Sequence, residues 1–214
     1  HITEEFVAKS IQKKSLFYDK RGEEHFNIIS VFQKSIRGSD PQAALYWLAR
    51  MLEAGEDPLY ITRRLVRIAS EDVGLADPRA IGIALQAWDA FDRLGAPEGE
   101  LALAECVLYL SVAAKYNAAY MAYNRAKRDV HETGSLDVPL HFRNASTTLM
   151  KDLGYGKNYS YDPDVEGGID YAQTAFPEAL GEPVYYQPVA QGAEMKIAEK
   201  LARIRALRKT HSSR

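Results

Sequence analysis

Apolar residues recur at the three- and four-residue spacing of amphipathic helices from residue 25 to about residue 154. Ile28, Phe32 and Ile36 predict a first helix that ends at Gly38. Three further segments with the same spacing follow, and they end close to glycines or just ahead of one: Gly55, Gly74 and Gly95. Few alternating β-branched runs interrupt this pattern, so the chain is expected to form an all-α body.

Each of these three segments begins at an Asp-Pro pair. Aspartate is a good N-cap because its carboxylate accepts a hydrogen bond from a free N–H of the first turn. Proline suits the first helical position, where its missing N–H costs nothing. The pattern therefore predicts three capped helix starts, at Asp40-Pro41, Asp57-Pro58 and Asp77-Pro78.

The next helix is expected to open at Pro97, and it is apolar nearly all round, which predicts a central place in the core. A helix over about 117–132 and a shorter one over 141–154 follow. The connectors are only a few residues long, so successive helices are expected to pack as antiparallel neighbours. An N-terminal helix over 2–12 and a charged connector over 13–25 precede this body.

The composition changes after residue 154. Residues 155–192 are rich in Tyr, Gly, Pro and Asp and show no helical period, which predicts an extended segment held over the helices by aromatic side chains. A short strand is expected at Val184-Tyr185-Tyr186. A disordered tail is the alternative, but so many tyrosines argue against it. The expected domains are 1–24 (helix and connector), 25–154 (helical collar), 155–192 (extended segment) and 193–214 (basic C-terminal helix).

Charge and cysteine content exclude few functions. The formal net charge of -2 gives no overall attraction to nucleic acid or acidic membranes. The single cysteine, Cys106, lies in an apolar helix and is expected to be a core residue in a protein of a reducing compartment. No apolar run is long enough to span a bilayer, and the first residues do not resemble a leader peptide. The chain starts without Met, so we expect a fragment whose natural N-terminus lies upstream.

Three long motifs carry a resemblance to a known family. The first motif, residues 25–80, contains KSIRGSDPQAALYWLARMLEAGEDPLYITRRLVRIASEDVGLADP. The second, residues 138–164, reads VPLHFRNASTTLMKDLGYGKNYSYDPD, and the third, residues 185–204, reads YYQPVAQGAEMKIAEKLARI. The chain resembles the C-terminal region of the AAA+ ATPases that include bacterial replication-associated recombination protein A and the eukaryotic Werner-helicase-interacting ATPase. One departure is AKYN at 114–117, where the family usually has Pro-Lys-Ser-Asn, and it leaves the local turn open.

This resemblance implies a helical collar similar to the oligomerisation domain of clamp loaders, assembled as a homotetramer. It also implies that the complete protein is a bacterial, cytoplasmic and nucleoid-associated DNA-dependent ATPase. Such a protein acts in replication, recombination and repair at stalled forks and associates with single-stranded-DNA-binding protein.

The chemistry of an ATPase is missing from the sequence. No GxxxxGK[ST] loop occurs, so neither the backbone cradle nor the lysine for nucleotide phosphates is in place. ATP and magnesium are therefore expected in an upstream module, and no cofactor, metal or catalytic residue is expected in this chain. The HETGS stretch lacks the second histidine of a zinc site, and the end of a helix ahead of Gly134 is the better interpretation of His131. His25 and His141 are expected to make hydrogen bonds and to take no part in catalysis.

Clustered basic residues are the candidates for DNA or partner contacts. In the helical body they either pair within the chain, as Arg67 can with Glu71 at i,i+4, or bind phosphates or a neighbouring module. The C-terminal helix is similarly either a solvated helix or a phosphate-binding one. The candidates are Lys34, Arg37, Arg63, Arg64, Arg67, Arg203, Arg205 and Arg208.

The subunit-interface candidates are Tyr46, Trp47 and Met51, which adjoin the wide apolar face of residues 44–52. They fit the core of the chain as well as an interface. Two functions are therefore weighed: a module that tetramerises a fork-associated ATPase, and a module that itself binds DNA or docks single-stranded-DNA-binding protein.

Overall fold

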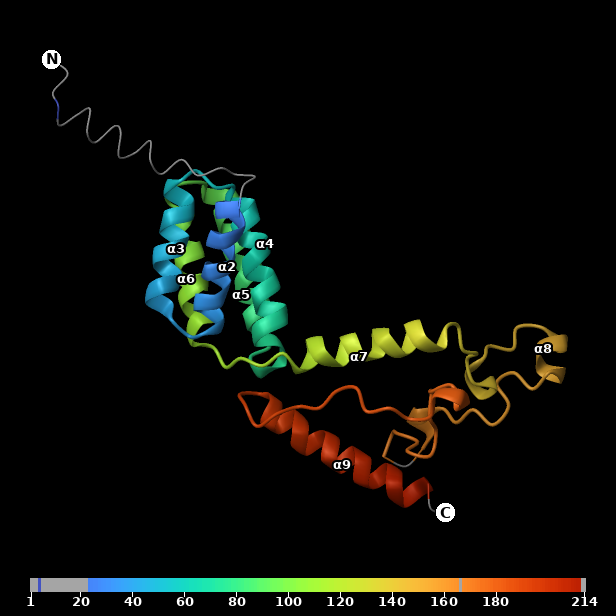
Figure 1. The fold of residues 1–214 in the computed structure, drawn as a ribbon. Coiled ribbons are helices and arrows are strands. Elements are labelled where there is room, and N and C mark those ends of the chain that lie inside the picture. Colours follow the sequence, from blue (N-terminus) through green and yellow to red (C-terminus); the bar gives the residue numbers. More distant parts are fainter. Residues whose placement is uncertain (1–3, 5–22, 166, 213–214) are drawn as a thin grey trace. The chain divides into compact units, whose positions relative to one another are not determined.

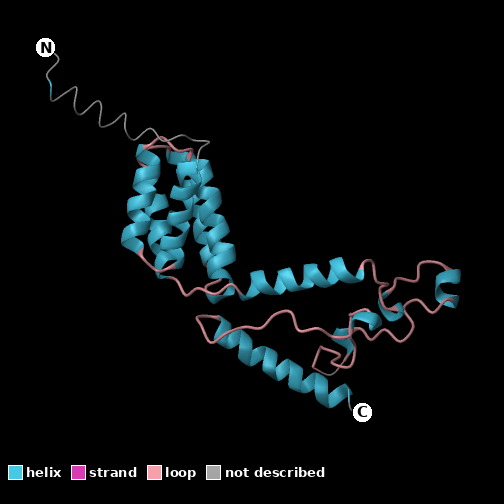
Figure 2. Cartoon of the chain, in the orientation of Figure 1, coloured by secondary structure: helices cyan, strands magenta, loops and turns pink. Residues whose placement is uncertain are grey.

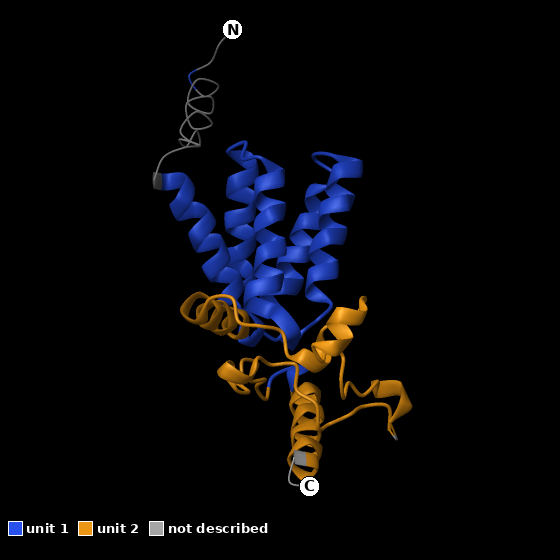
Figure 3. Cartoon of the chain, turned by 90° about the vertical axis from the view of Figure 1, so that its right-hand side faces the viewer, with its two compact units in different colours: residues 1–120, 191–194 blue, residues 121–190, 195–214 orange. Residues whose placement is uncertain are grey.

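The computed structural model describes residue 4, residues 23–165 and residues 167–212 (Figure 1). The helix predicted over 2–12 and most of the connector predicted over 13–25 lie outside these residues, apart from Glu4 and 23–25. Within the described part of the chain the secondary structure is helical, without a strand (Figure 2). The expected all-α fold is confirmed. The chain divides into two compact units (Figure 3): unit 1 runs to Tyr120 and includes Gln191–Glu194, and unit 2 holds the rest.

Residues 23–112 of unit 1 form a bundle of five helices. α2 begins at Glu23, two residues before the start that the apolar pattern predicts, and the remaining helices follow the predicted order. Their bounds are α2 Glu23–Arg37, α3 Pro41–Glu53, α4 Pro58–Ile68, α5 Ala80–Leu94 and α6 Glu100–Val112. α6 packs against each of the other four helices, so its predicted central position is confirmed.

Two of the three Asp-Pro pairs are helix caps as predicted. The Asp40 carboxylate accepts a hydrogen bond from the Ala43 N–H at 2.9 Å, and Asp57 accepts one from the Leu59 N–H at 2.9 Å. The third prediction is wrong, because α5 begins at Ala80, after Arg79. The α4 axis first continues through a π-helical turn and a 3-10 turn, and the Asp77 carboxylate is engaged by side chains. These turns are Ala69–Val73 and Gly74–Ala76.

The core of unit 1 lies where these helices meet. It contains no large polar side chain without a partner among the described residues. α6 contributes its inner face, on which Leu103, Val107 and Leu110 are fully buried. Burying an aliphatic side chain of this size stabilises the fold by roughly 1.5–3 kcal/mol. The remaining large members of the core include Phe32, Ile36, Met51, Ile61, Leu65 and Ile68.

Unit 2 consists of two longer helices and irregular chain. α7 begins within unit 1 at its first turn, and the predicted helix over 141–154 is shortened to α8, which Thr147 caps by accepting from the Met150 N–H. The helix does not begin at residue 141 because Arg143 is extended and its guanidinium donates to the Val138 carbonyl at 2.6 Å. The elements are α7 Ala118–Thr133, η3 Leu140–Phe142, α8 Thr148–Asp152, η4 Asp162–Asp164, η5 Glu178–Leu180 and α9 Glu194–Ser212.

The strand predicted at 184–186 is wrong. This segment is extended, but it runs between α7 and α9 without a partner strand (Figure 1). Arg125 of α7 donates to the Tyr185 carbonyl at 3.3 Å, and Arg205 of α9 donates to the Tyr186 carbonyl at 3.2 Å. The Tyr185 hydroxyl donates to Asp129 at 2.7 Å. The aromatic segment thus ties the two helices of unit 2 together through side chains.

Candidate functional site

The first motif forms a polar network at the end of α4. The π-helical turn places Asp72 beside α2, where its carboxylate accepts hydrogen bonds from Arg37 Nε at 2.6 Å and from Gln33 Nε2 at 3.1 Å. Arg64 donates in turn to Gln33 Oε1 at 2.9 Å. Asp72 and Gln33 are buried, so the network holds α2 against α4 through satisfied polar groups.

Some basic residues of this region are paired with carboxylates and others are not. Arg67 pairs with Glu71 at 2.8 Å, as the i,i+4 spacing predicts, and Arg37 pairs with Asp72. Hydrogen bonding to these carboxylates raises the pKa of both guanidinium groups. Arg63 lies 3.8 Å from Asp57 and Lys34 is exposed. The ionic partners of Arg37 and Arg67 favour the intrachain interpretation of these two candidates.

A second group of polar contacts in unit 1 involves Asp77 and residues 191–194. The Asp77 carboxylate accepts from Arg79 Nε at 2.9 Å and from the Tyr109 hydroxyl at 2.5 Å. The Ala193 N–H donates to the Ala76 carbonyl at 2.8 Å. Gly192 makes this approach possible, since a Cβ there would lie 2.1 Å from the Ala76 oxygen. These groups line a pocket of about 520 Å³.

The outer faces of α5 and α6 carry exposed apolar residues, and on α6 the exposed Glu105 lies among them. On α6, Leu101, Leu108 and Val112 follow the i, i+7, i+11 spacing of one helix face and are 66%, 40% and 71% exposed. On α5, Ile81 and Leu85 are 44% and 50% exposed at i,i+4. α6 therefore has apolar residues on its inner face and on its outer face. Large exposed apolar patches mark sites of interaction in most proteins.

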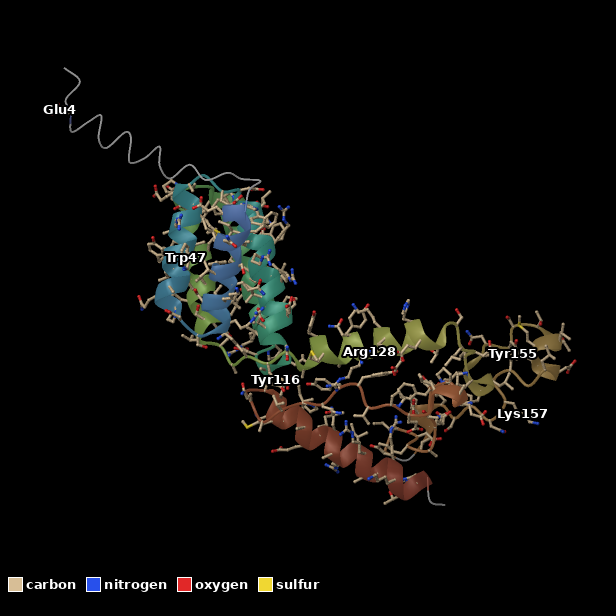
Figure 4. All side chains as sticks on the ribbon, viewed as in Figure 1. Glu4, Trp47, Tyr116, Arg128, Tyr155 and Lys157 are labelled. Carbon is tan, nitrogen blue, oxygen red and sulfur yellow. The ribbon has the colours of Figure 1, made fainter. Side chains whose placement is uncertain are left out.

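The three interface candidates on α3 lie in different surroundings. Tyr46 is 61% exposed, and Trp47 is partly buried against the core with the Arg50 guanidinium 5.3 Å from its ring (Figure 4). Met51 is 1% exposed inside the core, so its side chain cannot reach another subunit in this fold. Met51 is therefore corrected to a core residue.

Sequence reasoning missed the outer face of α6. The signal was present, because a helix that is apolar on all sides has more apolar surface than one core requires. This pattern predicts a central place in the core, but α6 also has a side that the other described helices of the bundle leave exposed.

Unit 2 buries very little of its own surface. Among its described residues only Ala122 is buried, at 9% exposure. Large apolar side chains such as Tyr123, Val130 and Leu149 are each more than 60% exposed. A pocket of about 870 Å³ is formed by residues 136–143 around Pro139 and by residues 174–179. The second motif is thus a packing motif, in which the Arg143 guanidinium lies 5.2 Å from the Tyr155 ring.

The basic candidates of α9 also divide into residues with an interaction partner and a residue without one among the described residues. Arg205 is engaged with the Tyr186 carbonyl, and Arg208 has an interaction partner as well. Arg203 is exposed, and no ion pair or hydrogen bond joins its side chain to another described residue.

The contacts predicted for the histidines and the core position predicted for Cys106 are confirmed. His25 Nδ1 lies 2.8 Å from Glu56 Oε2, and His141 Nε2 lies 3.3 Å from the Thr174 carbonyl. His131 is in the last turn of α7, which ends ahead of Gly134. Burial raises the pKa of the Cys106 thiol to about 12, so it is a core residue and a poor nucleophile. Within the described ranges no group of acidic, histidine or cysteine side chains could hold a metal ion, and no helix could span a membrane.

The turn after α8 contains Gly154, Gly156 and Lys157, a composition found in phosphate-binding loops (Figure 4 labels Lys157). Its N–H groups are already used. The N–H of Gly154 donates to the Lys151 carbonyl, that of Gly156 to the Leu140 carbonyl and that of Lys157 to the Gly154 carbonyl. This turn does not fit a nucleotide phosphate.

Residues 38–205 match the family described as MgsA AAA+ ATPase C terminal, and residues 1–37 match the AAA C-terminal domain. The chain belongs to the MgsA family of AAA+ ATPases. It is 54% identical over 196 residues to replication-associated recombination protein A of Coxiella burnetii, covering 92% of this chain and 44% of that protein. For the Haemophilus influenzae protein of the same name the identity is 52%, over 95% of this chain and 46% of that protein.

A eukaryotic member, the ATPase WRNIP1 of Dictyostelium discoideum, is 41% identical over 87% of this chain and 21% of that protein. The chain thus spans less than half the length of these relatives of the MgsA family. Each of the three motifs supplies contacts described above. The first contains the Asp72 network and Asp77, the second contains Arg143, and the third contains Tyr185 and Tyr186 between α7 and α9.

Proposed function

We propose that this chain is the self-association module, or collar, of an AAA+ ATPase that acts in DNA replication, recombination and repair. The names of its relatives support the role of the parent protein. The observation that carries the collar role is the group of exposed apolar residues around Glu105 on the outer face of α6, together with the exposed apolar residues of α5. A second copy of the chain is the occupant we propose for this surface.

Four copies in closed symmetry would cover these faces without leaving an open edge, so the proposed assembly is a homotetramer. The scarcity of buried residues in unit 2 supports the same proposal, because its apolar side chains would gain cover from neighbouring subunits. Among the α3 candidates, Tyr46 and Trp47 stay candidates for this interface.

Light scattering over a concentration series tests the assembly. We expect a tetramer at micromolar concentration, and we expect Leu108→Asp to reduce it to smaller species, since a charge buried in a dry interface costs several kcal/mol. Leu59→Asp is the matched control, because Leu59 is 37% exposed against 40% for Leu108 but lies on α4. A wild-type chain that stays monomeric well above micromolar concentration would contradict the proposal.

The proposal extends to the parent protein. ATP and magnesium would bind in a module upstream of this chain, since the sequence contains no GxxxxGK[ST] loop and the N–H groups of the Gly154–Lys157 turn already donate to carbonyl groups. The parent would be a DNA-dependent ATPase of the bacterial cytoplasm and nucleoid, with DNA and single-stranded-DNA-binding protein as partners. Calorimetry of this chain with Mg-ATP is expected to show no saturable heat, and a saturable signal would overturn this placement.

The exposed cations of α9 favour a second candidate function, direct contact with DNA or docking of single-stranded-DNA-binding protein. The observation in its favour is that Arg203 is exposed and has no ion pair or hydrogen bond within the described residues, whereas Arg67 and Arg93 are each paired with a carboxylate.

A further inference from the structure

Three cations on α9 form a continuous stripe. Lys196, Lys200 and Arg203 are related by i, i+4 and i+7 spacing, so they lie on one side of the helix. All three are exposed. No hydrogen bond or ion pair joins their side chains to any other residue that the structure describes. The apolar positions Ile197 and Leu201 are half-buried, on the inner side of the helix.

Such a stripe works against helix stability. Like charges at i,i+4 destabilise a helix by a few tenths of a kcal/mol per pair. Helix α5 avoids this, since Arg93 is paired with Asp89 at 2.9 Å and i,i+4 spacing. On α9, Glu199 is the only acidic residue among positions 195–212. Glu199 lies at i,i+4 to Arg203 and at i,i+3 to Lys196, but within the described residues no ion pair joins it to either cation, so no salt bridge offsets the repulsion between Lys196 and Lys200.

Acidic residues are abundant in the same unit but do not neutralise the stripe. Residues 121–190 contain ten Asp and Glu against six Lys and Arg. The acidic groups form other contacts, such as Asp129 with Tyr185 and Asp137 with Arg143. The charge of the stripe thus stays available to a ligand from outside.

We propose that Lys196, Lys200 and Arg203 form a track for the phosphodiester backbone of nucleic acid. At a rise of about 1.5 Å per residue the three cations extend over about 10 Å. One strand of DNA carries a charge about every 3.4 Å, so a single strand can contact all three cations at once. The proposal deepens the second candidate function and does not depend on self-association.

The track binds without reading sequence. Its three side chains are ammonium and guanidinium groups, which contact phosphate oxygens, and it holds no amide or aromatic side chain to read or stack a base. It is a poor match for a lipid surface, because the larger apolar residues of α9 except Met195 are at least half-buried. Nucleic acid is therefore the polyanion to which we assign it.

Fluorescence anisotropy of a labelled single-stranded oligonucleotide over a salt series tests the track. In the triple variant Lys196→Gln, Lys200→Gln, Arg203→Gln we expect the slope of log K against log salt to fall by about 2, at about 0.7 per lost contact. At 0.1 M salt this corresponds to binding roughly a hundredfold weaker.

The matched control removes the same charge from paired arginines, in a variant that changes each to Gln. These are Arg50, Arg67 and Arg93, each with a carboxylate oxygen within 3 Å. The control is expected to keep the wild-type slope to within about 1. Circular dichroism and thermal melting establish that both variants are folded.

Several results would overturn the proposal. One is a wild-type chain that does not bind the oligonucleotide at low salt, or that binds vesicles containing phosphatidylserine in its place. Another is an equal loss of binding in the two triple variants. A third is loss of self-association in the stripe variant by light scattering with oligonucleotide binding unchanged, which would assign the stripe to a subunit contact. If the wild-type chain is monomeric but binds the oligonucleotide through the track, the result contradicts the proposed collar and leaves the track proposal intact.

Discussion

Asp77 is a buried carboxylate held by three donors at the start of α5. Its hydrogen bonds from the Arg79 guanidinium lower its pKa most, and burial works in the opposite direction. The Tyr109 hydroxyl and the Arg79 N–H add to the lowering. A carboxylate engaged in this way ties α5 to α6 without capping either helix.

The first prediction concerns the pH dependence that Asp77 contributes. Because its pKa in the folded chain is below that in the unfolded chain, its stabilisation is fully present above about pH 4 and is lost as the pH falls below it. Asp77→Asn is expected to be destabilising at pH 7, with a difference from wild type that shrinks below pH 4. Denaturant unfolding between pH 3 and pH 7 measures this difference, and a difference independent of pH would contradict it.

The second prediction isolates the close approach at Gly192. Both Gly192 and Gly55 have positive φ, +52° and +74°, but a Cβ at Gly55 would meet nothing within 4 Å. Gly55→Ala should therefore cost only the strain of a Cβ in left-handed backbone, about 1–2 kcal/mol. Gly192→Ala should cost more, since its methyl group would displace the Ala76 carbonyl. Equal unfolding free energies for the two variants would remove the close approach as a cause.

At the scale of elements, α6 combines a core face with an exposed apolar face. The two faces can be separated by truncating one leucine on each. Leu103 is fully buried and Leu101 is 66% exposed, two positions along the same helix. Leu103 stabilises the fold of the single chain, whereas Leu101 would contribute to the contact with a second copy that we propose for the outer face of α6.

The third prediction follows from this pair. Leu103→Ala should lower the free energy of unfolding by about 2–5 kcal/mol at any protein concentration. Leu101→Ala should change it by less than about 0.5 kcal/mol in dilute solution, as surface substitutions do. At concentrations where the chain self-associates, the Leu101 variant should also be less stable. A large effect of Leu101→Ala on the monomer would place this residue in the core.

The elements that could be predicted from the sequence are those in which a local rule decides the structure. Asp40 and Asp57 cap their helices because the chain on either side is free to turn there. Asp77 does not, because Tyr109, which is distant in sequence, competes for its carboxylate. The segment at Tyr185 is not a strand, because arginines from two helices take its carbonyl groups.

The same limit applies to the candidate site. The i,i+4 pair of Arg67 and Glu71 could be read from spacing alone. The burial of Met51 and the exposure of Leu108 could not, since both residues lie on apolar helix faces and only the packing of the bundle separates them. The track on α9 required knowledge of which arginines the aromatic segment already engages.

At the scale of the whole molecule the two units differ in how they are stabilised. Unit 1 has a core of fully buried side chains, whereas unit 2 is connected mainly by hydrogen bonds and partly buried aromatic rings. A unit that buries so little apolar surface gains little free energy against its conformational entropy.

The fourth prediction is that a fragment of residues 121–212 does not fold cooperatively by itself. Its circular dichroism is expected to show reduced helix content and its thermal melt no sharp transition, since the fragment lacks a core. The full chain provides the comparison, since its unit 1, residues 23–120 with 191–194 among those described, should melt cooperatively. A sharp, concentration-independent transition of the fragment would show that unit 2 is stable by itself.

The hydrogen bond from Ala193 to Ala76 also bears on the order of folding. It closes a loop of more than a hundred residues, and closing a flexible loop of that length costs about 4 kcal/mol of chain entropy. The helix pairs of unit 1 close much shorter loops, so they are expected to form first and to present the Ala76 carbonyl before residues 191–194 reach it. Contacts that form after the transition state govern the rate of unfolding more than the rate of folding. Gly192 would then set how long residues 191–194 stay joined to Ala76 once folded, while leaving the rate of folding to the bundle.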